Sequence, residues 1–385
     1  MEYKLEELFD LQMGKTPSRD NPEYWNSKDC KWISIGDLSK CGKYIKETKE
    51  FLSDKAIEES GISLIPTNTV VMSFKLSIGK TAITPEPMYS NEAIMSFRDK
   101  HVLELLPDYL YYLLSGKDWD VGTNKAVMGK TLNKATLSKV KVKIHDISEQ
   151  HKIVQVLDRV KAVIDVRQLE LQRLDDLIKA RFVEMFGDET NQYNWPVVNV
   201  EEVANVSVGV VIKPAQYYTN PEHGVKAFRS LNIGPMTIKD GDWVYFSYEG
   251  NDKNAKSQLK ENDLLIVRSG APGTACVVPK QYEGCNAIDI IIARPNIERI
   301  NPYYLCMYTN MPHGKRQIEE GTGGAAQQHF NVGKYNKLRL MLPPMDLQKE
   351  FVDFVAQVDK SKCAVQKALD EAQLLFDSLM QKYFG

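Results

Sequence analysis

The sequence has few of the features that indicate a metal centre, a disulfide framework or a membrane span. Its six cysteines are scattered along 385 residues, with no C-x-x-C pair and no histidine at ligand spacing. Such a pattern fits free thiols in a reducing compartment. No run approaches the ~18–20 apolar residues of a membrane-spanning helix, and the opening MEYKLEELFD has no apolar signal core. We therefore expect a cytoplasmic protein that binds no metal and no membrane.

Catalytic signatures are missing as well. The sequence has no G-x-S-x-G, no H-E-x-x-H and no G-x-G-x-x-G after a strand, and GTGG (321–324) lacks the lysine of a phosphate-binding loop. Pro343-Pro344 follows Leu342 and precedes Met345, which does not fit the Asn/Asp-Pro-Pro-aromatic tetrapeptide of amino-methyltransferases. We predict that the chain is not an enzyme; an unrecognised nuclease with scattered carboxylates is the alternative.

What the chain does contain is an internal repeat. LNKATLSKVKVKI (132–144) matches FNVGKYNKLRLML (330–342) at an offset of 198, and 67–73 matches 261–267 at an offset of 194. The alignment then pairs residues as follows: Gly79 with Gly273, Ala93-Ile94 with Ala287-Ile288, and Tyr109 with Tyr303. A four-residue insertion near 311–314 accounts for the change of offset. The sequence thus predicts two tandem globular modules of roughly 145 residues, each followed by a long helix.

Local signals within the modules favour β structure. VVMSFKLSIGKTAI (70–83) and DLLIVRSGAPGTACVV (263–278) are typical of strand, tight loop and strand. KVKVKI (139–144) and KLRLML (337–342) alternate basic and apolar residues, as half-exposed strands do. Short helices fit 107–114 and 302–308, which both begin with proline. We expect a β-rich α+β fold, with a polar linker at 187–196.

The two long helices carry heptad stripes. In 148–187 the stripe consists of Ile153, Leu157, Val160, Ile164, Leu171, Leu174, Ile178 and Met185. It returns 198 residues later as Phe351, Val355, Val358, Val365, Leu369, Ala372, Phe376, Leu379 and Tyr383. Arg167, Arg181 and Lys362 interrupt the stripes, and we expect these charges to disfavour wrong registers. A stripe this narrow needs a partner, so we predict that the two helices, each roughly 55–60 Å long, pair with each other.

A net charge of −2 is unusual for a nucleic-acid-binding protein, but the basic residues are unevenly distributed. Residues 121–145 and 321–343 contain no acid, and they carry Lys125, Lys130, Lys134, Lys139, Lys141, Lys143, Lys334, Lys337 and Arg339. One basic strip is usually a solvated face. Because both modules carry such a strip immediately before the helix, we interpret the strips as contacts to phosphates.

Loops supply further candidates for DNA binding. In the first module these are Lys15, Thr16, Ser18, Arg19, Lys75, Ser77 and Lys80, and in the second Arg229, Arg268, Ser269, Gln327, Gln328 and His329. Gln327, Gln328 and His329 could read base edges, since glutamine pairs with adenine through two hydrogen bonds. For any single residue, an ordinary exposed polar side chain explains the pattern equally well.

Several motifs together point to a family. ARFVEMFGD (180–188) and NWP (194–196) precede the second module, and the first contains GKTPS (14–18), PEYW (22–25) and WISIGDL (32–38). With these motifs and its duplication, the whole chain resembles the specificity (S) subunit of type I restriction–modification systems. The second module departs from the pattern, with VGVV (208–211) in place of GKTP (14–17), so contacts of that loop are not carried over.

The resemblance implies two target-recognition domains, at 1–145 and 189–343, which each read one half of a split, asymmetric site in double-stranded DNA. It also implies that the helices at 146–188 and 344–385 pack as an antiparallel coiled coil with pseudo-two-fold symmetry and set the spacer. Two modification subunits dock on an S subunit, and restriction subunits join them. S-adenosylmethionine, ATP and magnesium belong to those partners, so no cofactor is expected here. The second hypothesis is a non-catalytic scaffold whose tandem modules bind proteins.

Overall fold

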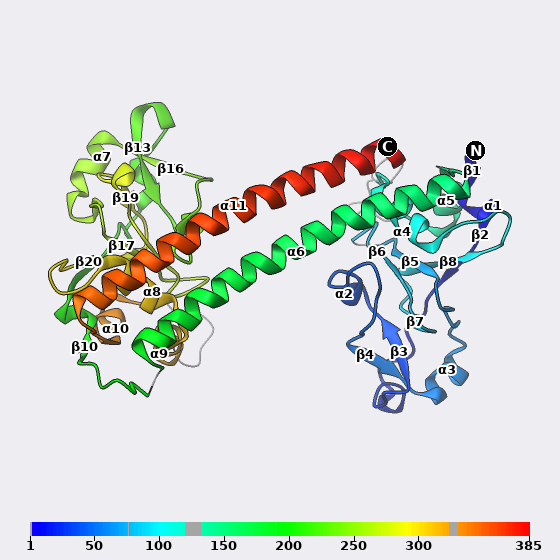
Figure 1. Ribbon diagram of the computed structural model, residues 1–385, viewed down its shortest axis with the longest axis horizontal. Coiled ribbons are helices and arrows are strands. Elements are labelled where there is room, and N and C mark those ends of the chain that lie inside the picture. The colour runs from blue at the N-terminus through cyan, green and yellow to red at the C-terminus, as the bar shows by residue number, and fades with distance from the viewer. Residues whose placement is uncertain (1, 76, 120–131, 189, 323–329) are drawn as a thin grey trace. The chain divides into compact units, whose positions relative to one another are not determined.

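The computed structural model describes residues 2–75, 77–119, 132–188, 190–322 and 330–385 (Figure 1). They form two compact units: unit 1 comprises Met1–Gln168 with Gln366–Gly385, and unit 2 comprises Leu169–Val365. The long helices α6 (Ile147–Phe186) and α11 (Met345–Phe384) confirm both predicted helices, and each contributes one end to each unit. Within the described ranges, none of the helices has both the length and the hydrophobicity needed to cross a bilayer.

Unit 1 is built on an antiparallel sheet of four strands in the order β2–β8–β5–β6 (Phe9–Met13, Ile94–Asp99, Val70–Ser73 and Thr81–Ile83). A smaller sheet has the order β4–β3–β7 (Glu50–Leu52, Cys30–Ile33 and Tyr89–Ser90), in which β7 runs parallel to β3. β1 (Glu2–Lys4) pairs with β9 (Lys141–Lys143). The helices of the unit are α1 (Leu5–Leu8), η1 (Pro22–Tyr24), α2 (Ile35–Leu38), α3 (Asp54–Ser60), α4 (Pro107–Gly116) and α5 (Lys134–Ser138).

Unit 2 repeats this plan. Its main sheet has the order β11–β20–β17–β18 (Ala204–Val208, Ile290–Pro295, Leu264–Val267 and Ala275–Val277). The second sheet is β12–β16–β13–β19 (Tyr218–Thr219, Val244–Ser247, Gly224–Phe228 and Asn286–Ala287), with β19 parallel to β13. The strand pairs are β10–β21 (Val197–Asn199, Arg339–Met341) and β14–β15 (Ile233–Gly234, Thr237–Ile238). Its helices are α7 (Tyr248–Lys253), α8 (Pro302–Asn310), α9 (Pro312–Thr322), α10 (Val332–Asn336) and η2–η7 (Val200–Glu202, Pro214–Tyr217, Pro221–His223, Ser230–Asn232, Ala255–Ser257 and Lys280–Tyr282).

The shared topology confirms the internal repeat down to single side chains. Gln150 and Gln348, both fully buried, each accept a hydrogen bond from a backbone N–H at the start of α4 or α8, at 3.0 and 2.8 Å. Gly79 and Gly273 both have positive φ, at 85° and 76°, as their predicted equivalence requires. The predicted hairpins, short helices and basic edge strands are present in both units.

Two predicted equivalences are wrong by one or two residues. Tyr109 corresponds to Tyr304 and not to Tyr303, because Tyr109 and Tyr304 are buried and bond the carbonyls of β9 and β21 residues, Lys143 and Met341. Ile94 corresponds to Ile290, since Ser73 pairs with Ile94 and Val267 pairs with Ile290. The Ala93-Ile94 match to Ala287-Ile288 therefore fails. Loops of different length between paired strands shift the offset step by step, which an alignment with only the two offsets 194 and 198 does not capture.

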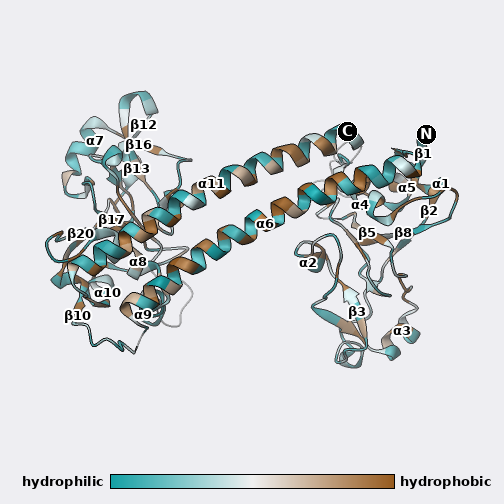
Figure 2. Cartoon of the chain, viewed as in Figure 1, coloured by the Kyte–Doolittle hydropathy of each residue, from teal (hydrophilic) through white to brown (hydrophobic). Residues whose placement is uncertain are grey.

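The heptad stripes face the cores. In unit 1, Ile153 and Leu157 of α6 share a core with Phe376, Leu379 and Tyr383 of α11. In unit 2, the opposite ends meet, since Ile178 and Phe182 pack with Phe351, Val355 and Val358. The two helices therefore run antiparallel within each unit, and every stripe residue is buried or half-buried. Figure 2 shows hydrophobic and hydrophilic residues alternating along both helices.

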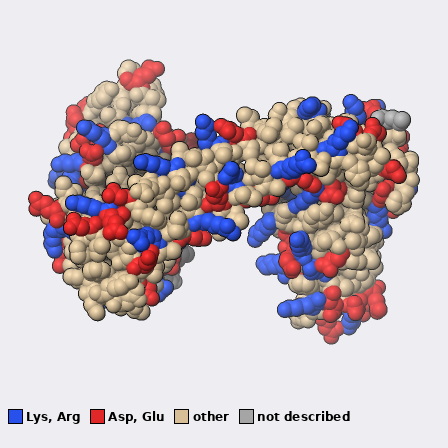
Figure 3. Space-filling view, in the orientation of Figure 1, with Lys and Arg blue, Asp and Glu red and all other residues tan. Residues whose placement is uncertain are grey.

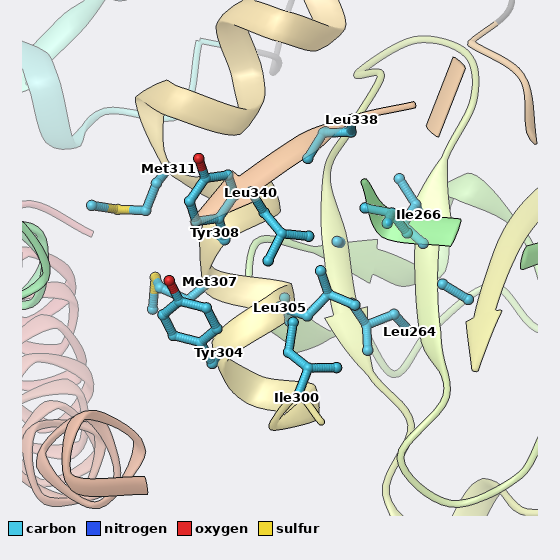
Figure 4. Close-up of a cluster of buried hydrophobic side chains, with 14 of the residues drawn as sticks. Leu264, Ile266, Ile300, Tyr304, Leu305, Met307, Tyr308, Met311, Leu338 and Leu340 are labelled. Atoms are coloured by element: carbon cyan, nitrogen blue, oxygen red, sulfur yellow. The ribbon is translucent and has the colours of Figure 1, made fainter. Parts of the chain in front are cut away.

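The core of unit 2 lies between its main sheet and α8 (Figure 4). Leu305 of α8 points toward Leu264 of β17, whereas Tyr304 and Tyr308 lie on the other side of α8. Both tyrosine rings pack against Phe182 of α6, with centroids 6.0 Å apart. Two charges that interrupt the stripes are paired between the helices in this unit: Arg181 Nη2 lies 3.0 Å from Glu350 Oε1, and Lys362 Nζ lies 2.7 Å from Asp175 Oδ1. These pairs favour the observed register.

Candidate nucleic-acid interface

In unit 1, two of the predicted DNA-binding loops meet at the turn between β7 and β8. The backbone N–H of Gly14 donates to the Ile94 carbonyl at 3.1 Å, and that of Lys15 donates to the Ser90 carbonyl at 2.8 Å. The N–H of Phe74, at the start of the β5–β6 loop, donates to the Ala93 carbonyl at 3.0 Å. Backbone hydrogen bonds thus bring together loops that are about 60 residues apart in the sequence.

The side chain at the centre of this turn is Glu92. The hydroxyl of Thr16 donates to its carboxylate, and this hydrogen bond holds the pKa of Glu92 below its usual value. The positive charges of Lys75 and Arg19 lower the same pKa further. Thr16 therefore bonds this carboxylate directly, and the charges of Lys75 and Arg19, from two loops, act on it. Glu92 itself was not predicted, because an isolated glutamate in a turn gives no sequence signal.

Arg19 lies beside two tryptophans and a second carboxylate. Its two terminal nitrogens bond the two oxygens of Glu50, with Nη2 3.1 Å from Oε2. Its guanidinium carbon lies 3.7 Å from the ring centroid of Trp25 and 5.1 Å from that of Trp32. Glu50 raises the pKa of Arg19 through this hydrogen bond, so the guanidinium stays charged.

The other predicted residues of unit 1 lie in different settings. Lys15 Nζ donates to the Ser60 carbonyl at 2.6 Å, and the Ser18 carbonyl accepts from the Trp25 indole at 3.0 Å. Ser77 and Lys80 are exposed in the β5–β6 loop. Lys134 and Lys139, in and just after α5, are also exposed. Lys125 and Lys130 lie outside the described residues.

In unit 2, an acid–base pair lies at the turn between β19 and β20, which is equivalent to the turn between β7 and β8 in unit 1. Arg268 donates through Nη1 to Asp289, which immediately precedes β20, and through Nε to the Phe330 carbonyl at 3.1 Å. Ser269 is half-buried beside it. Arg229 is half-buried and donates to the Asp242 carbonyl, whereas Lys334 in α10 is exposed. Gln327, Gln328 and His329 lie outside the described residues.

The loop after β11 occupies the place of the GKTPS loop in unit 1. Gly209 N–H donates to the Ile290 carbonyl at 2.9 Å and Val210 N–H donates to the Ala287 carbonyl at 2.7 Å, as Gly14 and Lys15 do in unit 1. Gly14 therefore corresponds to Gly209, so the predicted match of VGVV (208–211) to GKTP (14–17) is wrong by one residue. The loop continues with Val211 and Ile212, both exposed, so the same backbone carries apolar side chains here.

Charges of both signs are mixed on the face shown in Figure 3, where Lys and Arg alternate with Asp and Glu. Among the described residues, this face therefore shows no uniformly basic patch, and the best-oriented cation described above, Arg19, lies beside aromatic and acidic partners. Such an arrangement suits contacts to base edges as well as to phosphates.

Comparison with known proteins identifies the family. The family model described as "Type I restriction modification DNA specificity domain" matches residues 1–176 and, a second time, residues 169–372. The chain belongs to this family. It carries two copies of the specificity domain, in the order of the two units, and this confirms the resemblance seen in its motifs.

Relatives match over nearly the full length. The chain is 22% identical to the Type I restriction enzyme MjaIX specificity subunit of Methanocaldococcus jannaschii, with 98% of this chain and 91% of that protein covered. It is 20% identical to the EcoprrI specificity subunit of Escherichia coli, covering 89% and 84%.

Solved structures show the same fold. The S subunit from M. genitalium matches with a TM-score of 0.53 and 12% identity over 100% of this chain and 96% of that chain. A structure from work on complex assembly and conformational transition of the type I R-M system matches with a TM-score of 0.61, 16% identity and coverages of 100% and 97%.

Proposed function

We propose that this protein is the sequence-specific DNA-binding subunit of a type I restriction–modification complex, and that each unit reads one half of a split, asymmetric site in double-stranded DNA. The observation that carries the proposal is the second copy of the DNA specificity domain, on a unit with the same sheet topology and different loop side chains. Two domains that share a sheet topology and differ in their loop side chains can recognise two different half-sites.

We further propose that two modification subunits dock on the outer faces of α6 and α11, that restriction subunits join them, and that the chain itself catalyses nothing. The relatives are named specificity subunits of type I restriction enzymes, which supports this division of labour. In this proposal S-adenosylmethionine, ATP and magnesium serve the partners.

Methylome sequencing of a strain that carries this protein with its modification subunits tests the central claim. We expect methylation at one split sequence. Exchanging residues 1–145 for the module of another family member should change one half of that sequence and leave the other as it was. A methylome with no split motif would contradict the proposal.

The length of α6 and α11 gives a second test. We propose that the helices set the number of base pairs between the half-sites. Removing one heptad from each helix should alter the spacer and preserve both half-sites, because seven residues are two turns and keep the stripe in phase. Changed half-sites with an unchanged spacer would argue against the role.

A protein-binding scaffold is the alternative, and salt dependence separates the two. Phosphate contacts release counterions, so the affinity for DNA should fall steeply with salt. Replacing Lys134 and Lys139 with alanine should weaken binding to all sequences about equally and reduce the slope of log affinity against log salt by about one per contact. Binding that is insensitive to salt and to both lysines would favour the scaffold.

A further inference from the structure

The orientation of Arg19 is defined more closely than that of an ordinary exposed arginine. Glu50 holds both terminal nitrogens, and the ring of Trp25 lies against the guanidinium, 3.7 Å from its carbon. Even so, 50% of the side chain is exposed. An ion pair this exposed adds little to stability. What these contacts provide is a fixed direction for a charged group that still faces solvent.

The loop that carries Arg19 is itself anchored by the same aromatic side chains. Trp25 Nε1 donates to the Ser18 carbonyl at 3.0 Å, and Trp32 Nε1 donates to the Lys15 carbonyl at 3.1 Å. The two indoles pack edge to face, with centroids 5.0 Å apart. Trp32 belongs to β3, so the loop is held against a sheet. Sites supported in this way keep the geometry that recognition requires.

The guanidinium retains hydrogen-bond donors after pairing with Glu50. A guanidinium has five N–H donors, and this pairing uses one on each terminal nitrogen. Nε and the second hydrogen of a neighbouring terminal nitrogen form another edge, and no hydrogen bond from that edge to a described residue is present. Two parallel donors match O6 and N7 of guanine in the major groove.

We propose that Arg19 reads a guanine in the half-site of unit 1, with Glu50 and Trp25 as positioning residues. This inference rests on the proposed function and adds to it the base and the side chain that recognises it. Glu50 also favours a base contact over a phosphate contact for Arg19. Its negative charge repels the phosphate backbone, so the acceptors on the base edge are the better partners.

The test uses the complete complex of this chain with its modification subunits. We expect the unit 1 half-site, assigned by module exchange, to contain a G·C pair at which Arg19→Ala reduces discrimination about 5- to 150-fold. Arg19→Gln should move the preference at that pair toward adenine, since glutamine pairs with adenine through two hydrogen bonds. The other positions of the site should keep their preferences.

Two further variants separate base reading from charge and from structure. Lys28→Ala removes an exposed positive charge from the same part of unit 1 and should leave the motif unchanged. Glu50→Gln should reduce discrimination at the Arg19 position alone, and Glu50→Asp should restore part of it. A purely structural role of Glu50 would instead weaken binding at every position.

Binding of the wild-type complex to modified oligonucleotides makes the test independent of folding. Replacing the guanine with 7-deazaguanine removes N7 without changing base pairing, and affinity should drop at that position only. The inference is overturned if no guanine of the half-site is sensitive to this change, or if Arg19→Ala weakens all sequences uniformly, as a phosphate contact would. A wild-type complex that selects no split sequence would instead mean that the proposed function is wrong.

Discussion

The loops after β2 and β11 make equivalent backbone hydrogen bonds but carry different side chains. In both units a glycine and the next residue bond the same two strands, through Gly14 and Lys15 or through Gly209 and Val210. Beyond that point unit 1 presents Thr16, Ser18 and Arg19, whereas unit 2 presents exposed Val211 and Ile212. The comparison shows that the duplicated fold preserves the position of a loop and leaves its side chains free to differ.

A second comparison concerns the main sheets. Arg294 of β20 donates through Nε and Nη2 to the buried carboxylate of Asp263, at 2.8 and 2.7 Å. Strand register places Arg98 and Thr69 at the same positions in unit 1. With threonine there, Arg98 donates to the Leu64 carbonyl and its buried Nε has no partner among the described residues. An ion pair in one sheet is thus replaced by weaker contacts in the other.

The largest effect on stability is expected when the close backbone approach shared by the two loops is disrupted. A side chain at Gly14 would overlap the carbonyls of Ser90 and Asn91, and one at Gly209 would overlap that of Ala287. Gly14→Ala should destabilise unit 1 by about 3 kcal/mol and Gly209→Ala should do the same to unit 2, because backbone must move. Hydrogen–deuterium exchange resolves the effect by unit.

Gly42→Ala is the matched control, since a Cβ there meets no atom within 4 Å. Its effect should stay within about 0.5 kcal/mol. Equal exchange rates in Gly14→Ala and the wild type would show that the loop does not depend on this close approach.

The sheet comparison predicts an intermediate effect confined to unit 2. Asp263→Ala leaves Arg294 without its carboxylate and should cost about 2–3 kcal/mol, less than a fully buried pair because 40% of the Arg294 side chain is exposed. Thr69→Ala at the equivalent position should cost less than about 1 kcal/mol. Faster exchange in β17 and β20 checks the first change; similar losses for both variants would remove the distinction between the sheets.

The smallest effect on stability, with a clear effect on recognition, is expected for Ile212. The residue is 79% exposed, so Ile212→Ala should change stability by no more than about 0.5 kcal/mol. If this loop reads DNA, the unit 2 half-site should lose preference at one position, because apolar side chains recognise the thymine methyl group. Ile297→Ala, at a residue 65% exposed outside the loop, is the control for methylome sequencing. If Ile212→Ala instead changed the half-site of unit 1, the assignment of the loop after β11 to the unit 2 half-site would be wrong.

Some of the candidate site could be predicted and some could not. Thr16, Arg19 and Lys75 were predicted from loop composition, and backbone hydrogen bonds hold the two loops that carry them at one turn. The carboxylates that contact them, Glu50 and Glu92, gave no signal, because Arg19 and Glu50 are 31 residues apart and meet only in the folded chain. The basic strips were found by counting charge, yet counting could not show which lysines are exposed.

The sequence by itself determined the duplication, the two long helices and the presence of a hairpin at 70–83 and at 263–278. These depend on periodicity and turn residues that act over a few neighbours, so they can be read along the chain. Tertiary structure alone decided which tyrosines are equivalent, which arginines have a carboxylate partner, and that one loop position is polar in unit 1 and apolar in unit 2. Those features depend on strand register and on contacts between distant residues, which local patterns do not encode.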